Sequence, residues 1–206
     1  MANYFITGIG TNVGKTLASA ILTEALQADY WKPIQCGELD ATDKNNVKNL
    51  ISNTKTVFHN EVYLFKEPAS PHLSSASENT KIITEKIALP ITQNSLIIEG
   101  AGGILVPLNE NDFVIDIAKN LGAEIVLVCQ NYLGCINHSL LSIDYLIKNG
   151  FEIKGLILNG NFDKAVKSAI INYAEIHIIA EIPHLHQITK ETVLQQAQKI
   201  NLNLFN

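Results

Sequence analysis

Residues 4–22 read YFITGIGTNVGKTLASAIL. A short apolar run leads into a turn with Gly8, Gly10 and Gly14 that ends in Lys15 and Thr16, and an apolar helical segment follows at once. In such a turn, backbone N–H groups surround phosphate oxygens, the lysine reaches the β- and γ-phosphates, and the hydroxyl ligates Mg²⁺. The stretch therefore predicts a phosphate-binding loop between a strand and a helix.

The loop is a variant of the usual pattern G-x-x-x-x-G-K-[ST]. Gly8 stands one residue too early, and Ile9 holds the position where the pattern has glycine. A glycine-rich turn that only joins a strand to a helix is the simpler alternative. The strand and the helix on either side favour the phosphate loop, because Gly-Lys-Thr is specific in that context.

Apolar runs rich in Ile and Val alternate with helix-like segments along the chain. Such strands are buried on both faces, as in a parallel sheet covered by helices. We therefore expect one α/β domain over residues 1–206, with a mostly parallel β-sheet flanked by helices, like the P-loop nucleoside triphosphate hydrolases. The expected strands are 4–7, 96–99, 124–129, 155–158 and 176–182, with a further strand around Lys32. The expected helices are 15–27, 43–51, 114–120, 137–148, 163–173 and 192–200. Residues 67–72 contain two prolines and are expected to form a surface loop, neither helix nor central strand.

Three charged residues are placed to act with the loop. Glu99 ends an apolar strand and precedes a run of glycines. A carboxylate at the carboxyl end of a strand lies beside the phosphate loop of an open α/β sheet, where it can hold Mg²⁺. Lys32 would bring a positive charge to the same edge, and Asp43 could be a further metal ligand. A solvated strand end and ordinary surface charges are the simpler alternatives.

The composition limits the classes of partner. The chain has 206 residues with 15 lysines, no arginine and a net charge of −5, which argues against a nucleic-acid or anionic-membrane surface. Cys36, Cys129 and Cys135 show no disulfide or zinc spacing. No apolar run approaches the roughly 18 residues of a membrane span. We therefore expect no nucleic-acid partner, no membrane and a cytoplasmic location.

Several motifs together resemble the dethiobiotin synthetases, ATP-dependent enzymes that close the ureido ring in biotin synthesis. The matching segments span residue 3 to about residue 185, nearly the whole chain. They are the variant loop 8–16, Lys32-Pro33, Asp43, residues 67–72, Glu-Gly-Ala-Gly-Gly at 99–103, Leu-Gly-Cys-Ile-Asn-His at 133–138, and the segments 155–159 and 181–183.

The resemblance implies a role for each matching residue. Lys15 and Lys32 would be catalytic, because they would neutralise the transferring phosphoryl group. Thr16, Asp43 and Glu99 would hold Mg²⁺. The implied ATP-binding residues are Asn12, Val13, Gly14, Lys15, Thr16, Leu17, Asp43, Glu99, Gly100, Ala101, Gly102, Asn159, Gly160, Pro183, His184 and Leu185. The implied substrate-binding residues are Thr11, Lys32, Cys36, Leu133, Gly134 and Asn137.

The resemblance also implies a reaction and an assembly. ATP and CO₂ would be the co-substrates of a cyclo-ligase whose other substrate is 7,8-diaminononanoate. A carbamate of the diamine would attack the γ-phosphate, and the second amine would close the ring and expel phosphate. The family is a homodimer with the diamine at the subunit interface, so residues 133–137 would bind the substrate of the partner subunit.

Three positions depart from relatives of that family. Cys36 stands where relatives carry a small hydroxyl residue that contacts the substrate. Asn12 replaces an acidic residue of some members, and His184 stands where an aromatic residue can occur. A thiol is a weak hydrogen-bond donor, so Cys36 changes the chemistry of that contact.

Two other classes remain open from the sequence. A partitioning-type ATPase switch has a related loop, but typically with a further lysine early in the glycine run, where this chain has Gly10. An amidotransferase-related synthetase without its glutaminase domain would need a partner with a reactive cysteine, because no cysteine here lies in a nucleophile context.

Overall fold

The computed structural model describes residues 1–205, apart from the side chain of Ala174. Its centre is a six-stranded sheet in the order β2-β5-β1-β6-β7-β8, and every neighbouring pair of strands runs parallel. The strands are β1 (Asn3–Gly8), β2 (Asp29–Trp31), β5 (Leu96–Gly103), β6 (Glu124–Gln130), β7 (Ile153–Asn159) and β8 (Ile178–Ile182). The prediction of an α/β fold with a mostly parallel sheet is confirmed.

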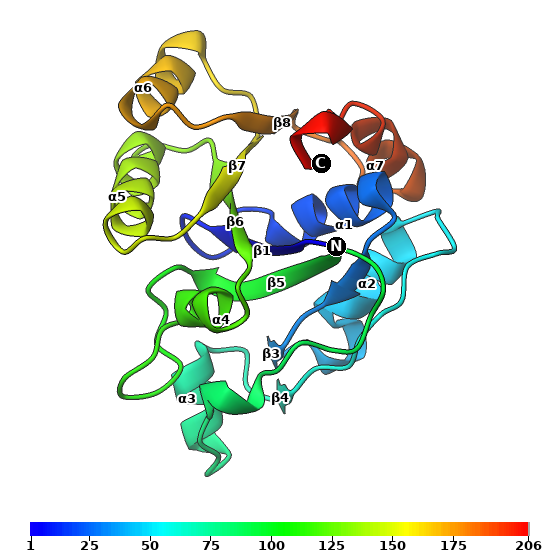
Figure 1. Ribbon diagram of the computed structural model, residues 1–206, viewed down its shortest axis with the longest axis vertical. Coiled ribbons are helices and arrows are strands. Elements are labelled where there is room, and N and C mark those ends of the chain that lie inside the picture. The colour runs from blue at the N-terminus through cyan, green and yellow to red at the C-terminus, as the bar shows by residue number, and fades with distance from the viewer. Residues whose placement is uncertain (206) are drawn as a thin grey trace.

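Helices cover both faces of this sheet (Figure 1). The helices on one face are α1 (Lys15–Leu26), α2 (Asp43–Leu50) and α7 (Lys190–Ala197), and those on the other are α4 (Val114–Asn120), α5 (Cys135–Lys148) and α6 (Lys164–Ala174). All six predicted helices form, and their ends shift by at most three residues. The helix-like segments of the sequence were therefore a sufficient guide to the helices.

The strands send alternate side chains into two separate hydrophobic cores. On β1, Phe5 packs into the core beneath α4, α5 and α6, while Tyr4 and Ile6 pack into the core beneath α1 and α7. On β6, Leu127 packs into the first of these cores and Val126 into the second. Because side chains of a strand point to opposite faces in turn, an apolar strand can be covered twice. This double burial fixes the sheet in the middle of the molecule.

Pro33 divides the strand expected around Lys32 into two. β2 ends at Trp31 in the main sheet, and β3 (Ile34–Cys36) pairs with β4 (Tyr63–Phe65) in a separate two-stranded sheet. Proline has no N–H group to give to a strand ladder, so the chain leaves the main sheet there. Lys32 therefore lies between the two sheets, just beyond the carboxyl end of β2.

The expectation that residues 67–72 contain no helix is wrong for the last two of them. Pro71 and His72 begin α3 (Pro71–Ser77), with proline in the first turn. Proline is favoured at this point because the first N–H groups of a helix have no partner within the helix in any case. Pro71 is also buried rather than part of a surface loop. Short 3₁₀ turns complete the chain: η1 (Leu39–Ala41), η2 (Thr84–Lys86) and η3 (Leu202–Phe205).

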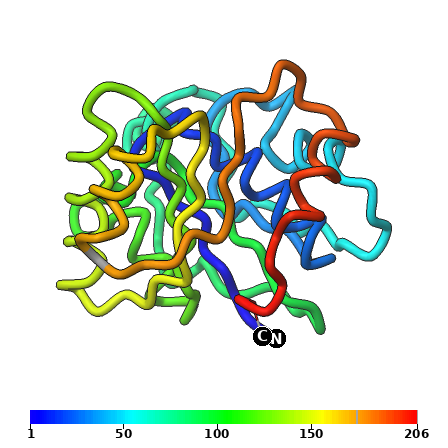
Figure 2. Tube along the Cα trace, turned by 90° about the horizontal axis from the view of Figure 1, so that it is seen from above, coloured from blue at the N-terminus to red at the C-terminus, as the bar shows by residue number. Residues whose placement is uncertain are grey.

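The two ends of the chain lie together at the edge of the molecule (Figure 2). Tyr4 donates its hydroxyl hydrogen to the carbonyl oxygen of Phe205 across 3.1 Å, and the two rings meet edge to face with their centroids 5.1 Å apart. This contact fastens the last turn to β1, at the end of the strand away from the glycine-rich loop.

Asp29 fastens the beginning of β2 to two neighbouring loops. Its buried carboxylate accepts hydrogen bonds from Val57 N (2.9 Å), Thr92 Oγ1 (2.6 Å) and Asn94 Nδ2 (2.9 Å), and it lies 3.1 Å from His59 Nε2. Burial by itself would raise the pKa of this carboxyl, but the hydrogen bonds outweigh burial and hold the pKa below its usual value. The charged form is therefore the one that stabilises the fold.

We predict that Asp29→Asn lowers the free energy of unfolding by about 2 kcal/mol at pH 7, because hydrogen bonds to a charged group contribute roughly 1.5–3 kcal/mol. The folded pKa lies below the unfolded value of about 4. The contribution is therefore complete above that pH and is lost as the pH falls through the folded pKa. Urea unfolding of both chains between pH 7 and pH 2 measures it. The exposed Asp40 provides the control variant Asp40→Asn, and a difference that stays constant down to pH 2 would contradict the prediction.

Candidate active site

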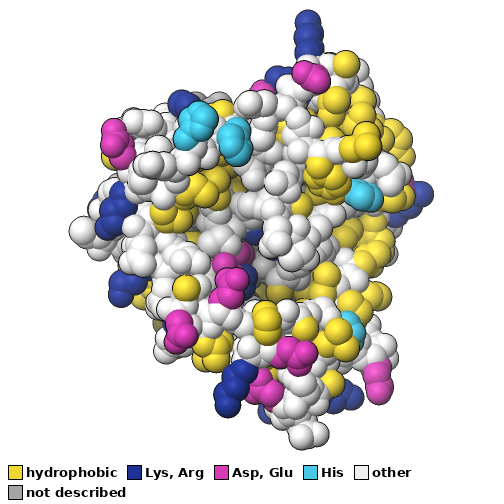
Figure 3. All heavy atoms as spheres, turned by 180° about the vertical axis from the view of Figure 1, so that it is seen from behind, with side chains coloured by type: hydrophobic (Ala, Val, Ile, Leu, Met, Phe, Trp, Pro, Cys, Tyr) yellow, Lys and Arg dark blue, Asp and Glu magenta, His cyan; other side chains and the backbone are white. Residues whose placement is uncertain are grey.

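A cavity of about 700 Å³ lies at the carboxyl ends of β1 and β5. It is visible as a hollow near the centre of the face in Figure 3, with acidic and lysine side chains beside it. Its walls come from the glycine-rich loop, the segment after β2, the turn before α3 and the end of β5. The lining residues are Thr11, Asn12, Gly14, Lys15, Thr16, Leu17, Lys32, Ile34, Gln35, Cys36, Glu38, Asp43, Pro68, Ala69, Ser70, Pro71, Glu99, Ala101, Gly102, Val106 and Ile188.

The glycine-rich loop is shaped by left-handed backbone conformations. Asn12 has a φ of +60°, and Gly14, which caps the beginning of α1, has a φ of +96°. From the end of β7, Asn159 donates a hydrogen bond from Nδ2 to the carbonyl oxygen of Val13 (2.9 Å), and its side chain packs against Gly14. β7, which lies two strands away from β1 in the sheet, thus holds the loop open toward the N-terminus of α1. Anions are favoured at that end of a helix.

Lys15 folds back onto its own loop. Its Nζ donates a hydrogen bond to the carbonyl oxygen of Gly10 across 3.0 Å. Burial lowers the pKa of Lys15 to about 8, and the carboxylates of Glu99 and Asp43 oppose this effect only in part. An anion bound in the loop would stabilise the charged form. The position of Lys15 is therefore suited to a phosphate group.

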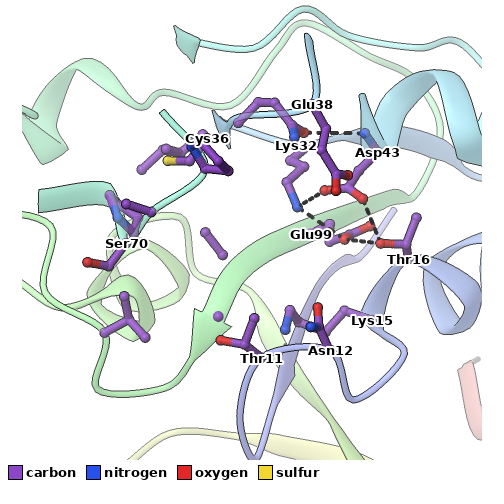
Figure 4. Close-up of a pocket in the computed structure, with 18 of the residues that line it drawn as sticks. Thr11, Asn12, Lys15, Thr16, Lys32, Cys36, Glu38, Asp43, Ser70 and Glu99 are labelled. Atoms are coloured by element: carbon purple, nitrogen blue, oxygen red, sulfur yellow. Dashed lines mark hydrogen bonds and ion pairs between the residues drawn. The ribbon is translucent and has the colours of Figure 1, made fainter. Parts of the chain in front are cut away.

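Three oxygen-bearing side chains meet at the beginning of α1 (Figure 4). Thr16 Oγ1 lies 2.9 Å from Asp43 Oδ1 and 2.9 Å from Glu99 Oε1. The three residues come from the first turn of α1, the first turn of α2 and the fourth position of β5. The fold thus brings together three residues that the sequence separates widely.

Lys32 lies between the same two carboxylates. Its Nζ is 2.5 Å from Asp43 Oδ2 and 3.2 Å from Glu99 Oε1. Burial by itself would lower the pKa of Lys32, but the two negative charges outweigh burial and raise it. Burial would likewise raise the pKa of Asp43, and the Lys32 charge lowers it instead. The site therefore holds an ammonium group between carboxylates.

The donor set fits a Mg²⁺ ion that also binds phosphate. Mg²⁺ prefers octahedral oxygen coordination, and proteins commonly supply one or two carboxylates while phosphates and water supply the rest. Thr16, Asp43 and Glu99 offer a hydroxyl and two carboxylates beside the loop. Among residues 1–205, no three His, Cys, Asp or Glu side chains are grouped so that they could hold a metal ion. An ion at this site would therefore depend on phosphate oxygens for its remaining ligands.

Two further residues, which the sequence analysis did not predict, hold the carboxylates in place. Tyr30 donates its hydroxyl hydrogen to Glu99 Oε2 across 2.8 Å, and the side-chain carbonyl of Gln35 accepts a hydrogen bond from the Asp43 backbone N–H (3.3 Å). Burial, together with the Glu99 charge, raises the pKa of Tyr30 well above its usual value, so the hydroxyl keeps its hydrogen. One signal in the sequence could have found Tyr30, because a tyrosine in a buried strand needs a polar partner for its hydroxyl.

A second cavity of about 360 Å³ adjoins the first along α1. Leu17 and Ile188 line both cavities. The second cavity is also lined by five of the residues that the resemblance implies to bind ATP, namely Asn159, Gly160, Pro183, His184 and Leu185, together with Gln130, Asn131 and Asn161, for which there was no prediction.

Several predicted site residues line neither cavity. Val13 is buried in the core, and Gly100 packs against the ring of a core phenylalanine. Leu133, Gly134 and Asn137 lie exposed at the beginning of α5, where the Leu133 side chain has no cover at all (103% exposed). The described chain by itself thus leaves these three residues outside the site.

The predicted substrate residues Thr11 and Cys36 both line the larger cavity. Cys36 is half-buried, and burial raises the pKa of its thiol, so it is a neutral group there. Cys36 lines the same cavity as the apolar residues Ile34, Ala69 and Val106. The larger cavity therefore has a charged end beside Lys32 and a mainly apolar end beside Cys36.

A family model described as an AAA domain matches residues 2–192. The curated relatives include the ATP-dependent dethiobiotin synthetase BioD of Cytophaga hutchinsonii, which is 43% identical over 97% of both chains. The corresponding protein of Christiangramia forsetii is 40% identical over 98% of this chain and 97% of its own. Among solved structures, a putative plasmid partition protein from Borrelia burgdorferi bound to AMPPNP has a TM-score of 0.60 at 15% identity and covers 99% of this chain and 97% of its own. That likeness shows the fold, and it confirms the predicted P-loop architecture.

None of the helices in the described part of the chain combines the length and apolar character that a membrane crossing requires.

We predict that Gly14→Ala weakens binding of a non-hydrolysable ATP analogue by about tenfold or more. A Cβ there would lie 2.2 Å from Asn159 Nδ2, and the φ of +96° strains any residue with a side chain. Isothermal titration calorimetry measures the affinity. Gly122→Ala is the matched control, because Gly122 also has a positive φ (+59°) but has nothing within 4 Å of the added Cβ. Equal affinities of the two variants would contradict the role of this close approach.

Proposed function

Since the chain belongs to the family of ATP-dependent dethiobiotin synthetases, we propose that it closes the ureido ring in the cavity between the glycine-rich loop and α3. Its activity is that of an ATP-dependent ligase of biotin biosynthesis. One observation carries the assignment of the site: Lys32, Thr16 and the carboxylates of Asp43 and Glu99 converge at one end of that cavity.

The substrates are ATP and 7,8-diaminononanoate, with CO₂ as the source of the new carbonyl carbon. One amine adds to CO₂ and loses a proton, which gives a carbamate. A carbamate oxygen attacks the γ-phosphorus of ATP, and ADP leaves. The second amine then attacks the carbon of the carbamoyl phosphate, and phosphate leaves as the ring closes. No enzyme nucleophile is needed, so the chain's contribution is positioning and charge stabilisation.

Two lysines neutralise the negative charges that this reaction brings together. Lys15 exchanges the Gly10 carbonyl for the β- and γ-phosphates, which lie over the loop. Lys32 contacts the carbamate and the transferring phosphoryl group from its place between Asp43 and Glu99. Fixed charges in a site that excludes water stabilise developing charge most strongly. When bound to Thr16, Asp43 and Glu99, Mg²⁺ would neutralise the β- and γ-phosphates.

The smaller cavity suits the base of ATP, and the larger cavity suits its phosphates together with the diamine. The base of ATP occupies the smaller cavity around Asn159 and Pro183, and its phosphates reach the larger one past Leu17, which lines both. The aliphatic chain of the diamine lies along the apolar end of the larger cavity near Cys36. A volume of about 700 Å³ lies within the range of small-molecule sites.

The substrate site is completed by a second copy of the chain. Leu133, Leu141 and Ile147 are exposed on and just before α5, and exposed apolar patches of this kind commonly mark interaction surfaces. Hydrophobic side chains gather along the right edge of Figure 3, the edge that α5 and α6 occupy at the left of Figure 1. In this homodimer, Leu133, Gly134 and Asn137 bind the carboxylate tail of the partner's diamine.

We do not propose the alternative function of a partitioning-type ATPase. The likeness to a ParA family ATPase of Chlorobium tepidum TLS, at 11% identity and a TM-score of 0.58 over 97% of this chain and 99% of that one, concerns the fold alone. As part of the same proposal, the chain acts in the cytoplasm, which is the location expected from its sequence.

We predict that Lys15→Gln and Lys32→Gln each lower turnover by roughly 10²–10³-fold, as expected when a group that stabilises transition-state charge is lost. The rate of dethiobiotin formation measures the effect, and circular dichroism verifies the fold. Lys154→Gln is the matched control, because Lys154 also forms an ion pair (3.1 Å from Glu124) but lies at the other end of the sheet. A variant at Lys15 or Lys32 with near-normal turnover would remove that residue from the mechanism.

The function itself is tested by ATP turnover with and without 7,8-diaminononanoate, in the presence of bicarbonate and Mg²⁺. We expect ADP release to depend on the diamine and dethiobiotin to accumulate in equal amount, as detected by mass spectrometry. A nonanoate with a single amine provides a control, since it cannot close a ring. ATP cleavage that proceeds equally without the diamine, and without dethiobiotin, would contradict the assignment.

A further inference from the structure

Tyr30 has no part in the reaction described above, yet its side chain reaches the active site from within the core. The residue is fully buried in β2, in the core beneath α1. Its hydroxyl contacts Glu99 Oε2 at 2.8 Å. Glu99 is itself 1% exposed, so water does not easily replace this hydrogen bond.

The register of the sheet explains how the contact arises. Tyr30 lies beside Ile97 in the parallel pair of β2 and β5, and both side chains belong to the same core. Glu99 follows two residues later on β5, so its side chain points to the same face about 6.6 Å further along the strand. A tyrosine side chain that leans toward the carboxyl end of the sheet spans this distance, whereas a shorter side chain would not.

Residues 57–59 hold Tyr30 through both its backbone and its ring. The backbone of Tyr30 accepts a hydrogen bond from His59 N (2.9 Å) and donates one to the Val57 carbonyl (3.0 Å). The ring of Phe58 lies beside that of Tyr30, with the centroids 5.9 Å apart. These contacts fix the position of the Tyr30 hydroxyl beside Glu99.

The two oxygens of Glu99 thus have different partners. Oε1 accepts hydrogen bonds from Thr16 (2.9 Å) and Lys32 (3.2 Å), and Oε2 accepts its hydrogen bond from Tyr30. The Tyr30 hydroxyl keeps Oε2 turned into the core, and this orientation leaves Oε1 facing Thr16 and the cavity. Groups that hold a ligating carboxylate by a hydrogen bond commonly change metal affinity by 10–100-fold when they are removed.

We propose that Tyr30 is a positioning residue for the metal site: its hydroxyl orients Glu99 so that Oε1 is the oxygen offered to a divalent cation beside the phosphates. The proposal rests on the proposed function, because the cation at Thr16, Asp43 and Glu99 belongs to that function. Tyr30 acts through Glu99 and does not touch the substrates.

The test is Mn²⁺ binding to Tyr30→Phe in the presence of a non-hydrolysable ATP analogue, with free Mn²⁺ followed by electron paramagnetic resonance. Phenylalanine keeps the ring and removes only the hydroxyl. We expect the Mn²⁺ dissociation constant to rise by about tenfold. Tyr4→Phe is the matched control, because Tyr4 is buried in the same core and also loses one hydrogen bond, to Phe205, without contact to Glu99. Its Mn²⁺ affinity should stay within about twofold of the parent chain.

Steady-state kinetics separate positioning from a general structural role. In Tyr30→Phe, the Mg²⁺ concentration for half-maximal dethiobiotin formation should rise by about tenfold, while the KM for the diamine stays within about twofold. Unchanged Mn²⁺ affinity would overturn the proposal. So would a lower kcat with no change in the Mg²⁺ requirement, or a Tyr30→Phe chain that circular dichroism shows to be unfolded while Tyr4→Phe remains folded.

Failure of the proposed function is a different result. A parent chain that binds Mn²⁺ but forms no dethiobiotin would overturn the function, and the comparison of Tyr30→Phe with Tyr4→Phe would still decide the role of Tyr30. A parent chain that binds no Mn²⁺ in the presence of the nucleotide analogue would overturn both.

Discussion

A buried ammonium group between two carboxylates governs the arrangement of this molecule. Lys32 Nζ contacts Asp43 at 2.5 Å and Glu99 at 3.2 Å, and its side chain is only 7% exposed. Charges removed from water are tolerated only when they are paired closely and hydrogen-bonded. The end of β2, the beginning of α2 and the end of β5 must therefore meet within hydrogen-bonding distance, and the turns that connect these elements are shaped accordingly.

The parallel sheet supplies the common edge at which this meeting is possible. All six strands have their carboxyl ends on one side, so the loops that leave β1, β2 and β5 open into the same space. Two helices begin there as well, with Thr16 in the first turn of α1 and Asp43 at the first position of α2. The positive ends of these helices favour the negative groups that gather at the edge. The charges of Lys15 and Lys32 then balance those of the two carboxylates.

Local patterns account for the parts of the fold that were predicted well. The five long strands are mainly apolar over their own length, and each helix shows its character within its own segment, so the identity of these elements does not depend on distant contacts. The division of the expected strand at Pro33 and the start of α3 at Pro71 depended on the segments that pack around these prolines. Proline can end a strand or begin a helix, and the neighbouring chain decides between them. The pairing of β3 with β4 brings together segments nearly thirty residues apart, which no local pattern shows.

The amino-acid sequence was enough to identify a phosphate loop, Glu99 at a strand end, Lys32 near the same edge of the sheet, and a family. These signals lie in short segments whose chemistry depends on residue type and spacing. It could not show that Lys32 bridges two carboxylates, that Asn159 holds the loop through Val13, or that Tyr30 turns Glu99. Those relations join residues up to 146 positions apart. They exist only once the strands are in register, because a side chain reaches its partner through the spacing of the sheet and not through the order of the chain.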